Sequence, residues 1–150
     1  MTRNTLRFGA LGMFCALSVT VTGLAFADGK DWNDGPVVNS AYIRTVDGHF
    51  DDYMHWLATT YKKQQETAKA AGLITNWRVM VVEPRTPQDP DIILVTEFKN
   101  WAALDHLGSK MDQVSEKVEG STEAAAKSEA DRAKIRTVLG SRTMQEALLK

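Results

Sequence analysis

The sequence predicts a single α+β domain, and three observations lead to this prediction. The composition is that of a globular protein, because 43% of the 150 residues are hydrophobic and 25% are charged. Segments with the two-residue periodicity of strands alternate along the chain with segments that have the 3.6-residue periodicity of helices. The length suits one domain. The formal net charge of -1 gives no indication of nucleic-acid binding.

The first 27 residues have the features of a secretory signal peptide. Arg3 and Arg7 form a basic start, residues 8–27 contain no charged side chain, and Ala25 and Ala27 place small residues before a cleavage site. A membrane anchor is the alternative interpretation of the apolar stretch, but the cleavage site favours removal. We therefore expect an exported protein, periplasmic or secreted, with no stable membrane span after cleavage.

The only cysteine, Cys15, belongs to this signal peptide. The mature chain would then have no thiol, which excludes disulfides, thiolate metal sites and cysteine nucleophiles. Residues 28–36 are rich in Gly, Asp and Asn, and we expect them to form a flexible leader. The folded domain is predicted over residues 37–150.

The first half of this domain contains three predicted strands and one predicted helix. Val37–Val46 has the β-branched and aromatic residues of a strand. From Phe50 an apolar stripe repeats at helical spacing, and this helix should end at Gly72. The strands Ile74–Glu83 and Ile92–Phe98 follow, joined by a loop that holds three prolines.

The second half contains two predicted helices and a tail that the sequence leaves open. Asn100 should cap a helix that ends at Gly120. Ser121 should cap a further helix over Thr122–Leu139, which is rich in Ala, Glu and Lys. The tail Ser141–Lys150 alternates as a strand does, yet its Gln, Glu, Ala and Leu residues favour a helix.

If the tail is a strand, the order of elements gives a ferredoxin-like β-α-β-β-α-β fold with an extra helix before the last strand. Its four strands would form one antiparallel sheet with both long helices on one face. Apolar residues of the two middle strands would then be exposed on the other face, among Val79, Val81, Ile93, Val95 and their neighbours. We therefore expect a homodimer through the sheet face.

This arrangement resembles the dimeric α+β barrel superfamily. The resemblance rests on the element order, the hairpin Trp77–Phe98, the helix that starts at Asn100-Trp101, and the terminal Leu139–Arg142 followed by Glu146–Lys150. That group includes small monooxygenases of antibiotic biosynthesis and haem-handling proteins, and the chain is most similar to its exported, uncharacterised members. The resemblance implies the ferredoxin-like fold and a dimer, whereas no catalytic residue of the family carries over.

Aromatic and arginine side chains are the candidates for ligand binding. Aromatic residues near the predicted sheet and first helix could line an apolar pocket, although such residues are more often core contacts. Arginines on strands could hold an anionic ligand or protect a sheet edge. The candidate binding residues are Tyr42, Tyr53, Trp56, Trp77, Arg44 and Arg78.

Histidines are the candidates for haem ligation or proton transfer. His55 and His106 both point away from the predicted apolar stripes, which favours solvated surface residues. Asp52 lies three residues before His55 and could orient its imidazole. Neither histidine has the spacing of a metal site, so we expect no metal and no cofactor, with haem as the alternative.

We therefore expect an exported dimer that binds a small apolar or aromatic molecule or has a structural role. The alternative is a cofactor-independent monooxygenase or a haem-linked enzyme that uses the pocket between sheet and helices.

Overall fold

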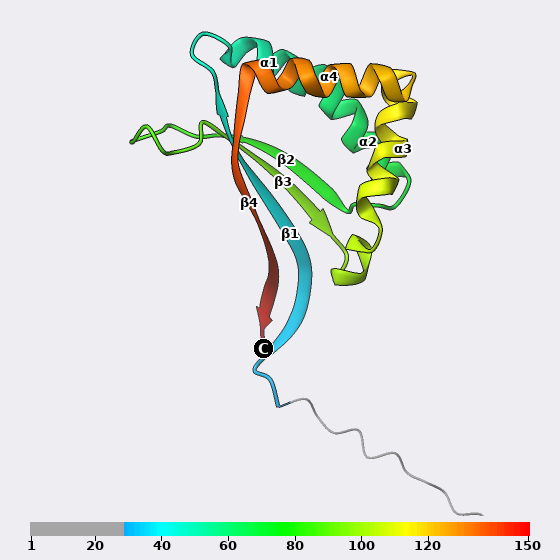
Figure 1. The fold of residues 1–150 in the computed structure, drawn as a ribbon. Helices are drawn as coiled ribbons and strands as arrows, with labels where there is room; N and C mark the ends of the chain where they lie inside the picture. The colour runs from blue at the N-terminus through cyan, green and yellow to red at the C-terminus, as the bar shows by residue number, and fades with distance from the viewer. Residues whose placement is uncertain (1–28) are drawn as a thin grey trace, which may run out of the picture.

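The computed structural model describes residues 29–150, so the predicted signal peptide over 1–27 lies outside the described residues. These residues form an α+β fold, which confirms the predicted class (Figure 1). In chain order the elements are β1 (Trp32–Thr45), α1 (Phe50–Trp56), the π-helical turn η1 (Leu57–Tyr61), α2 (Lys62–Ala70), β2 (Asn76–Val81), β3 (Ile92–Phe98), the 3₁₀ helix η2 (Trp101–Leu104), α3 (Leu107–Glu119), α4 (Thr122–Ile135) and β4 (Arg136–Leu149).

The four strands form one antiparallel sheet in the order β2-β3-β1-β4. This is the strand order of the predicted ferredoxin-like fold, and α4 is the predicted extra helix before the last strand. At the end of the sheet where β3 begins, Ile43 of β1 lies opposite Ile92 of β3 and Val138 of β4. The tail that the sequence left open is therefore a strand.

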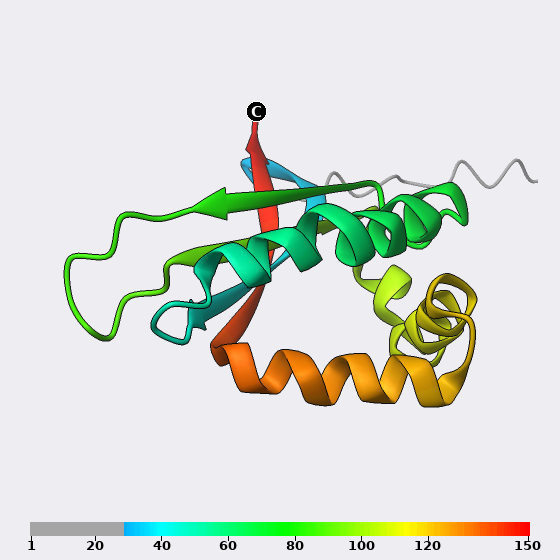
Figure 2. The same cartoon turned by 90° about the horizontal axis from the view of Figure 1, so that it is seen from above.

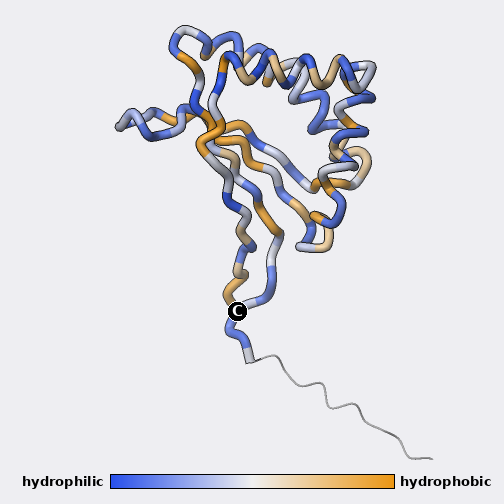
Figure 3. Tube along the Cα trace, viewed as in Figure 1, coloured by the Kyte–Doolittle hydropathy of each residue, from blue (hydrophilic) through white to orange (hydrophobic). Residues whose placement is uncertain are grey.

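One face of the sheet is covered by helices, as Figure 2 shows from above. Val37 of β1 and Phe98 of β3 pack in one buried cluster with Ala68 of α2 and Val114 of α3. Both long helices therefore lie on the same face, which confirms the prediction. We call this the helix face and the opposite one the outer face. Hydrophobic residues are concentrated along the strands, whereas the helices carry many hydrophilic ones (Figure 3).

A second buried cluster joins the other end of the sheet to the first helical segment. Ile43 and Ile92 of the sheet pack there against Tyr53, Leu57 and Tyr61. Burying each such side chain stabilises the fold by roughly 1.5–3 kcal/mol. The clusters follow from the periodicity of the sequence, because the predicted stripe from Phe50 supplies Tyr53, Leu57, Tyr61 and Ala68, and the apolar face of the next predicted helix supplies Val114.

The first helical segment ends where the sequence predicts. Gly72 has a φ of +71°, a left-handed conformation that a glycine adopts without a Cβ clash. Within the segment, η1 is a π-helical turn that the apolar stripe does not reveal. The helix therefore continues through Leu57–Tyr61 with one wider turn.

The helix before the last strand is shorter than predicted. We expected it over Thr122–Leu139, but α4 ends at Ile135 and β4 begins at Arg136. Thr137 and Val138 are β-branched and suit a strand, and pairing with β1 supplies hydrogen bonds to their backbone. The predicted cap at the start of α4 is confirmed, because Ser121 Oγ accepts a hydrogen bond from the Ala124 N–H at 3.1 Å.

The helix predicted to begin after Asn100 is divided in two. Asn100 caps η2, and its side chain accepts a hydrogen bond from the Ala103 N–H at 3.2 Å. His106 then adopts a left-handed φ of 56°, and α3 begins at Leu107. A non-glycine residue in this conformation breaks the helical path, so the direction of the chain changes before α3.

Strands β1 and β2 differ in extent from the prediction. Residues 32–36 were expected in the flexible leader over 28–36, but they form the start of β1, and residues 32–34 pair with β4. A Cβ at Gly35 would lie 3.0 Å from Glu146 Cβ, so this glycine permits a close approach of β4 rather than a loop. The strand predicted over Ile74–Glu83 is confined to Asn76–Val81.

Some side chains on the outer face of the sheet are buried by neighbouring side chains of the same face. Val95 and Ser40 are only 6% and 7% exposed there, and the side chains of Arg78 and Glu97 form an ion pair beside them. Met80 is half exposed on the same face. The homodimer through this face stays a prediction.

No helix among residues 29–150 has the length and apolar character to span a membrane.

Candidate functional site

A cavity of about 290 Å³ lies between the helix face of the sheet and helices α2 and α3. Five apolar and three uncharged polar side chains line it, and none of the eight is ionisable. A mostly apolar pocket with a few polar groups is the usual form of a small-molecule site. The lining residues are Asn39, Gln65, Ile74, Thr96, Phe98, Leu104, Leu107 and Met111.

The sheet supplies the polar part of the cavity wall. Asn39 of β1 lies directly opposite Thr96 of β3 in the register, so their side chains project from the same face. The Asn39 amide donates to Thr143 Oγ1 at 2.8 Å, which ties this residue to β4. Because β3 pairs with β1 along its length, the two polar groups are held at fixed positions.

The helices supply the rest of the wall. Leu104 ends η2, and Leu107 begins α3, with the left-handed His106 between them. Met111 lies one turn after Leu107 on the same side of α3. The break at His106 is therefore what brings η2 and α3 to the cavity from two directions.

Gln65 of α2 is the buried polar group of the site. It is 6% exposed, and its Oε1 atom accepts no hydrogen bond from any residue in the described part of the chain. A buried acceptor without a donor costs about 1–3 kcal/mol. This unpaired acceptor belongs to a residue of the cavity wall.

An aromatic cluster adjoins this site and contains three of the predicted binding residues. Tyr53 stacks on Trp56 with ring centroids 5.7 Å apart. Trp56 contacts Tyr61 at 5.7 Å, and Tyr61 meets Trp77 edge-on at 5.9 Å. The structure thus brings Tyr53, Trp56 and Trp77 together, but as packing within the domain, and none of them lines the cavity.

Tyr61 lies one turn before Gln65 and remains protonated over a wide pH range. Burial raises the pKa of Tyr61 from 10.0 to about 12, and a hydrogen bond with the Thr96 side chain opposes this rise. Thr96 also lines the cavity. The polar side of the site therefore consists of neutral groups at physiological pH.

The other three predicted binding residues belong to the outer face. Tyr42 lies opposite Ile93 and lines a separate cleft of about 530 Å³ with Pro90 and Leu139. Arg44 follows two residues later on the same face, and Arg78 forms its ion pair with Glu97. The structure therefore separates these residues from Tyr53, Trp56 and Trp77 by the thickness of the sheet.

The predicted histidines also lie away from the cavity. His55 and His106 are both exposed, and neither contributes to the cavity wall. Asp52 contacts the Nδ1 atom of His49 at 2.8 Å, and not His55 as the spacing had suggested. Across residues 29–150, no three His, Cys, Asp or Glu side chains gather in a way that could hold a metal ion.

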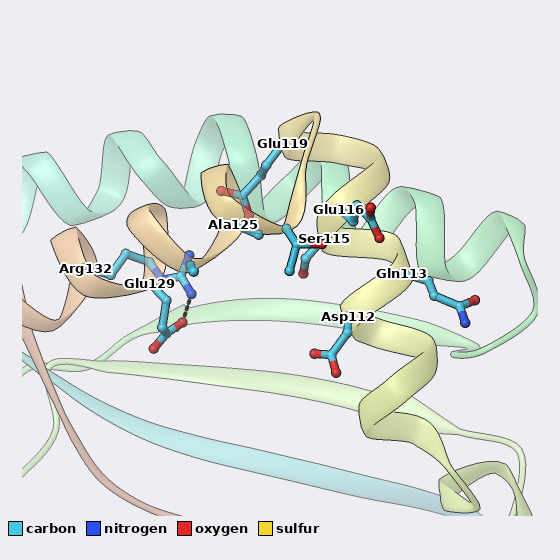
Figure 4. A pocket seen from close by; sticks show the side chains of 10 residues that line it. Asp112, Gln113, Ser115, Glu116, Glu119, Ala125, Glu129 and Arg132 are labelled. Atoms are coloured by element: carbon cyan, nitrogen blue, oxygen red, sulfur yellow. Dashed lines mark hydrogen bonds and ion pairs between the residues drawn. The ribbon is translucent and has the colours of Figure 1, made fainter.

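A second cavity, of about 380 Å³, lies between α3 and α4 (Figure 4). Its wall is strongly acidic, with carboxylates at Asp112, Glu116, Glu119 and Glu129. Glu129 forms an ion pair with Arg132, and Glu119 accepts a hydrogen bond from Gln64 Nε2 at 2.7 Å. Most of these carboxylates lie on the solvated sides of the two helices, so the apolar cavity is the better candidate for a ligand.

The sequence-based choice of residues missed the cavity because it favoured aromatic and charged side chains. The usable signal was a polar residue at a position where the periodicity predicts a buried one. Gln65 follows Tyr61 by four residues on the apolar stripe, and Asn39 and Thr96 occupy inward positions of their strands. The apolar members of the wall carry no such signal, because they look like ordinary core residues.

Comparison with known proteins gives little further information. No family model matches the chain, and no curated protein matches it. A crystal structure of HapK from Hahella chejuensis overlaps 73% of this chain and 91% of its own, with a TM-score of 0.47 and 14% sequence identity.

Proposed function

We propose that this protein binds a small, neutral, mainly apolar molecule in the cavity between the sheet and helices α2 and α3. The observation that supports this proposal most directly is the composition of the wall, which has five apolar side chains and three uncharged polar ones. A charged ligand would lose its hydration there without gaining an opposite charge.

The size of the cavity limits the ligand. A cavity of roughly 150 Å³ accommodates one benzene ring, and this cavity measures about 290 Å³. A molecule of about two fused rings would therefore fill it. The amide of Gln65 favours a ligand that carries one hydrogen-bond donor, because its Oε1 atom has no partner among the described residues.

Binding is a better account of this site than catalysis. None of the lining side chains titrates near neutral pH, whereas general acid–base catalysis needs a group with a pKa close to the working pH. The monooxygenase alternative rests on the family resemblance, and the haem-linked alternative rests on that resemblance and on His55 and His106, neither of which lines the cavity. They would be supported if a bound aromatic ligand were converted to an oxidised product, which mass spectrometry of the mixture would detect.

The test is a titration of the purified protein with three probes of one size: 2-naphthol, naphthalene and 2-naphthoate. We expect 2-naphthol to bind most tightly in isothermal titration calorimetry, naphthalene more weakly, and the naphthoate anion not at all. Leu107→Trp fills the cavity and should abolish binding. Val46→Trp adds the same side chain at an exposed position and should leave binding unchanged.

Two results would contradict the proposal. One is the absence of heat for every probe with a protein that is folded by circular dichroism. The other is equal binding by the protein and its Leu107→Trp variant, which would place the ligand elsewhere.

We further propose that the protein acts outside the cytoplasm. The proposal rests on the basic start, the uncharged stretch and the Ala-Phe-Ala sequence that ends at Ala27. N-terminal sequencing of the protein from an exporting cell should begin at Asp28. A mature chain that begins at residue 1 or 2 would contradict it.

A further inference from the structure

The cavity between the sheet and helices α2 and α3 is largely enclosed by its wall. None of its eight lining residues is exposed, and three of them, Gln65, Ile74 and Phe98, are buried. A ligand that fills the cavity has to pass side chains of this wall on its way in. Entry therefore depends on which part of the wall can move.

The 3₁₀ helix η2 is the least firmly packed element of the wall. It lies where β3 ends and α3 begins (Figure 1). The other elements of the wall, β1, β3, α2 and α3, each place a buried side chain in the core, namely Val37, Phe98, Ala68 and Val114. No residue of η2 is buried. Segments with few buried apolar contacts open at the lowest free energy, so η2 is the part of the wall most able to move.

The backbone leaves the helical conformation at both ends of η2. Asn100 before it is extended, with φ −166° and ψ 179°, and Asp105 after it has a ψ of 121°. The Ala103 N–H donates to the Asn100 carbonyl and the Asp105 N–H donates to the Ala102 carbonyl, both at 3.2 Å. These bonds keep η2 together with its cap, so residues 100–104 can turn as one body.

The turn that follows η2 is fixed to α3. Lys110 Nζ donates to the Asp105 carbonyl at 2.8 Å, and Ser109 Oγ donates to the His106 carbonyl at 3.0 Å. His106 is held there in its left-handed conformation. The two joints about which η2 can turn therefore lie before Asn100 and before Asp105.

A hydrogen bond holds η2 against the sheet. Trp101 Nε1 donates to Gln145 Oε1 at 2.9 Å. Val37 of β1 lies between Phe98 of β3 and Gln145 of β4 in the register, so the indole reaches from η2 across β1 to β4. Gln145 is fixed in turn, because its Nε2 atom donates to the Gly35 carbonyl at 3.2 Å. The Trp101 side chain is 49% exposed, so burial contributes little to holding it.

We propose that η2 is a lid that opens to admit the ligand and that the hydrogen bond between Trp101 and Gln145 holds the lid closed. Leu104 is the residue of η2 that lines the cavity, so turning η2 outward withdraws this side chain from the wall. The identity of the ligand rests on the proposed function, whereas the opening of the lid does not require a ligand.

The hydrogen bond should control the rate of exchange and not the affinity. It is made by two residues outside the cavity wall, so it is present in the closed lid with or without a ligand. A group that interacts equally with the free and the bound protein does not change the binding equilibrium. Removing the bond should therefore speed entry and exit by the same factor.

The first test measures access to the cavity without any ligand. In a Cys15→Ala background, Ile74→Cys places a thiol in the cavity wall at a position that is 4% exposed. We expect Trp101→Phe to raise the rate of its labelling by N-ethylmaleimide about fivefold, which corresponds to the loss of one neutral hydrogen bond.

Two matched controls separate lid opening from general loosening of the fold. Ile43→Cys places a thiol in the other core cluster, at a position that is 1% exposed and outside the cavity. Its labelling rate should not change with Trp101→Phe. Trp32→Phe makes the same substitution at an exposed tryptophan of β1 and should leave the labelling of Ile74→Cys unchanged.

A double-variant cycle tests the bond itself. Gln145→Met removes the acceptor and should speed the labelling of Ile74→Cys as Trp101→Phe does. Because both changes break the same bond, the double variant should label no faster than either single variant.

The second test follows 2-naphthol by stopped-flow fluorescence. We expect Trp101→Phe to raise the association and dissociation rate constants together, again about fivefold, and to leave the Kd unchanged. If 2-naphthol does not bind at all, the proposed function fails, and the labelling rates alone then decide whether η2 opens.

Three results would overturn the lid. One is labelling of Ile74→Cys that does not respond to Trp101→Phe. Another is equal acceleration at Ile43→Cys, which would indicate loosening of the whole fold. The third is faster labelling with unchanged rate constants for 2-naphthol, which would show that the ligand enters by a different route.

Discussion

The guanidinium of Arg132 in α4 lies over the indole ring of Trp56 in α1, with its central carbon 4.2 Å from the ring centroid. Arg136 lies similarly over Tyr53, at 5.7 Å. Glu129 forms ion pairs with both arginines. The contact between Arg132 and Trp56 joins α4 to α1. Burial and the neighbouring Arg136 disfavour the charged form of Arg132 and lower its pKa from the usual value.

Replacing Arg132 should weaken the attachment of α4. Arg132→Met keeps most of the side-chain volume but removes the cation–π contact and leaves Glu129 with less charge opposite it. We expect the free energy of unfolding in urea to fall by about 1–2 kcal/mol. Lys127→Met removes an exposed ion pair with Asp131 and should change the free energy of unfolding by less than about 1 kcal/mol. Equal stability of the two variants would show that the contact with Trp56 contributes nothing.

Two adjacent glutamines should respond in opposite directions to the same substitution. Gln64 Nε2 donates to Glu119 Oε1 at 2.7 Å, and Gln64→Leu should lower the free energy of unfolding by about 1–2 kcal/mol. Gln65 has a buried Oε1 atom without a donor, and Gln65→Leu should raise the free energy of unfolding by about 1 kcal/mol. Urea unfolding of both variants checks this, and destabilisation by Gln65→Leu would indicate a hidden partner for the amide.

Gln65→Leu should also change ligand preference if the proposed function holds. The variant loses the acceptor, so its affinity for 2-naphthol should approach its affinity for naphthalene, as calorimetry would measure. A variant that still distinguishes the two probes as the natural chain does would remove Gln65 from the site.

Tyr61 should make the protein sensitive to alkali. Burial raises the pKa of Tyr61 from 10.0 to about 12. A raised pKa contributes stability that is fully present below the unfolded pKa and is lost as pH rises toward the folded one. Urea midpoints should therefore fall between pH 10 and about 12, and less steeply in Tyr61→Phe. An identical fall in both proteins would assign the sensitivity to another group, such as Tyr53, whose pKa is also raised.

Asp131 should add a small acid sensitivity to the protein, because its ion pairs with Lys127 and Lys134 are exposed to solvent. Hydrogen bonds from Lys127 and Lys134 lower the pKa of Asp131 from 3.8 to about 2. A lowered pKa contributes stability above the unfolded pKa that is lost as pH falls toward the folded one. Urea midpoints should decline from about pH 4 to pH 2, and the decline should be smaller in Asp131→Asn. The idea fails if the variant and the natural chain lose stability in parallel.

The order of elements could be predicted from the sequence because local signals agree with the fold. The stripe from Phe50, the stop at Gly72 and the caps at Asn100 and Ser121 each depend on residues close in the chain. The end of α4 could not be predicted in this way. Residues 136–139 form a strand because β1 lies beside them, and this partner is about a hundred residues away in the sequence.

The candidate site was less predictable than the fold. Whether an aromatic residue such as Trp77 lines a cavity or fills the core depends on how closely its neighbours approach, and a periodicity does not contain that distance. Asn39, Gln65 and Thr96 can be noticed as polar residues at buried positions. Only the packing of α3 against the sheet shows that they share one cavity.

The π-helical turn at Leu57–Tyr61 has a consequence for how the chain length can vary. A π turn spans one more residue than an α turn, so losing one residue there would leave a regular α-helix. Ala58 and Thr59 are exposed within this turn, and either could be deleted without removing a buried side chain. A homologue one residue shorter at this position could therefore keep Tyr53 and Gln65 on the inward side, whereas the same deletion in α2 would rotate the following residues by about 100°.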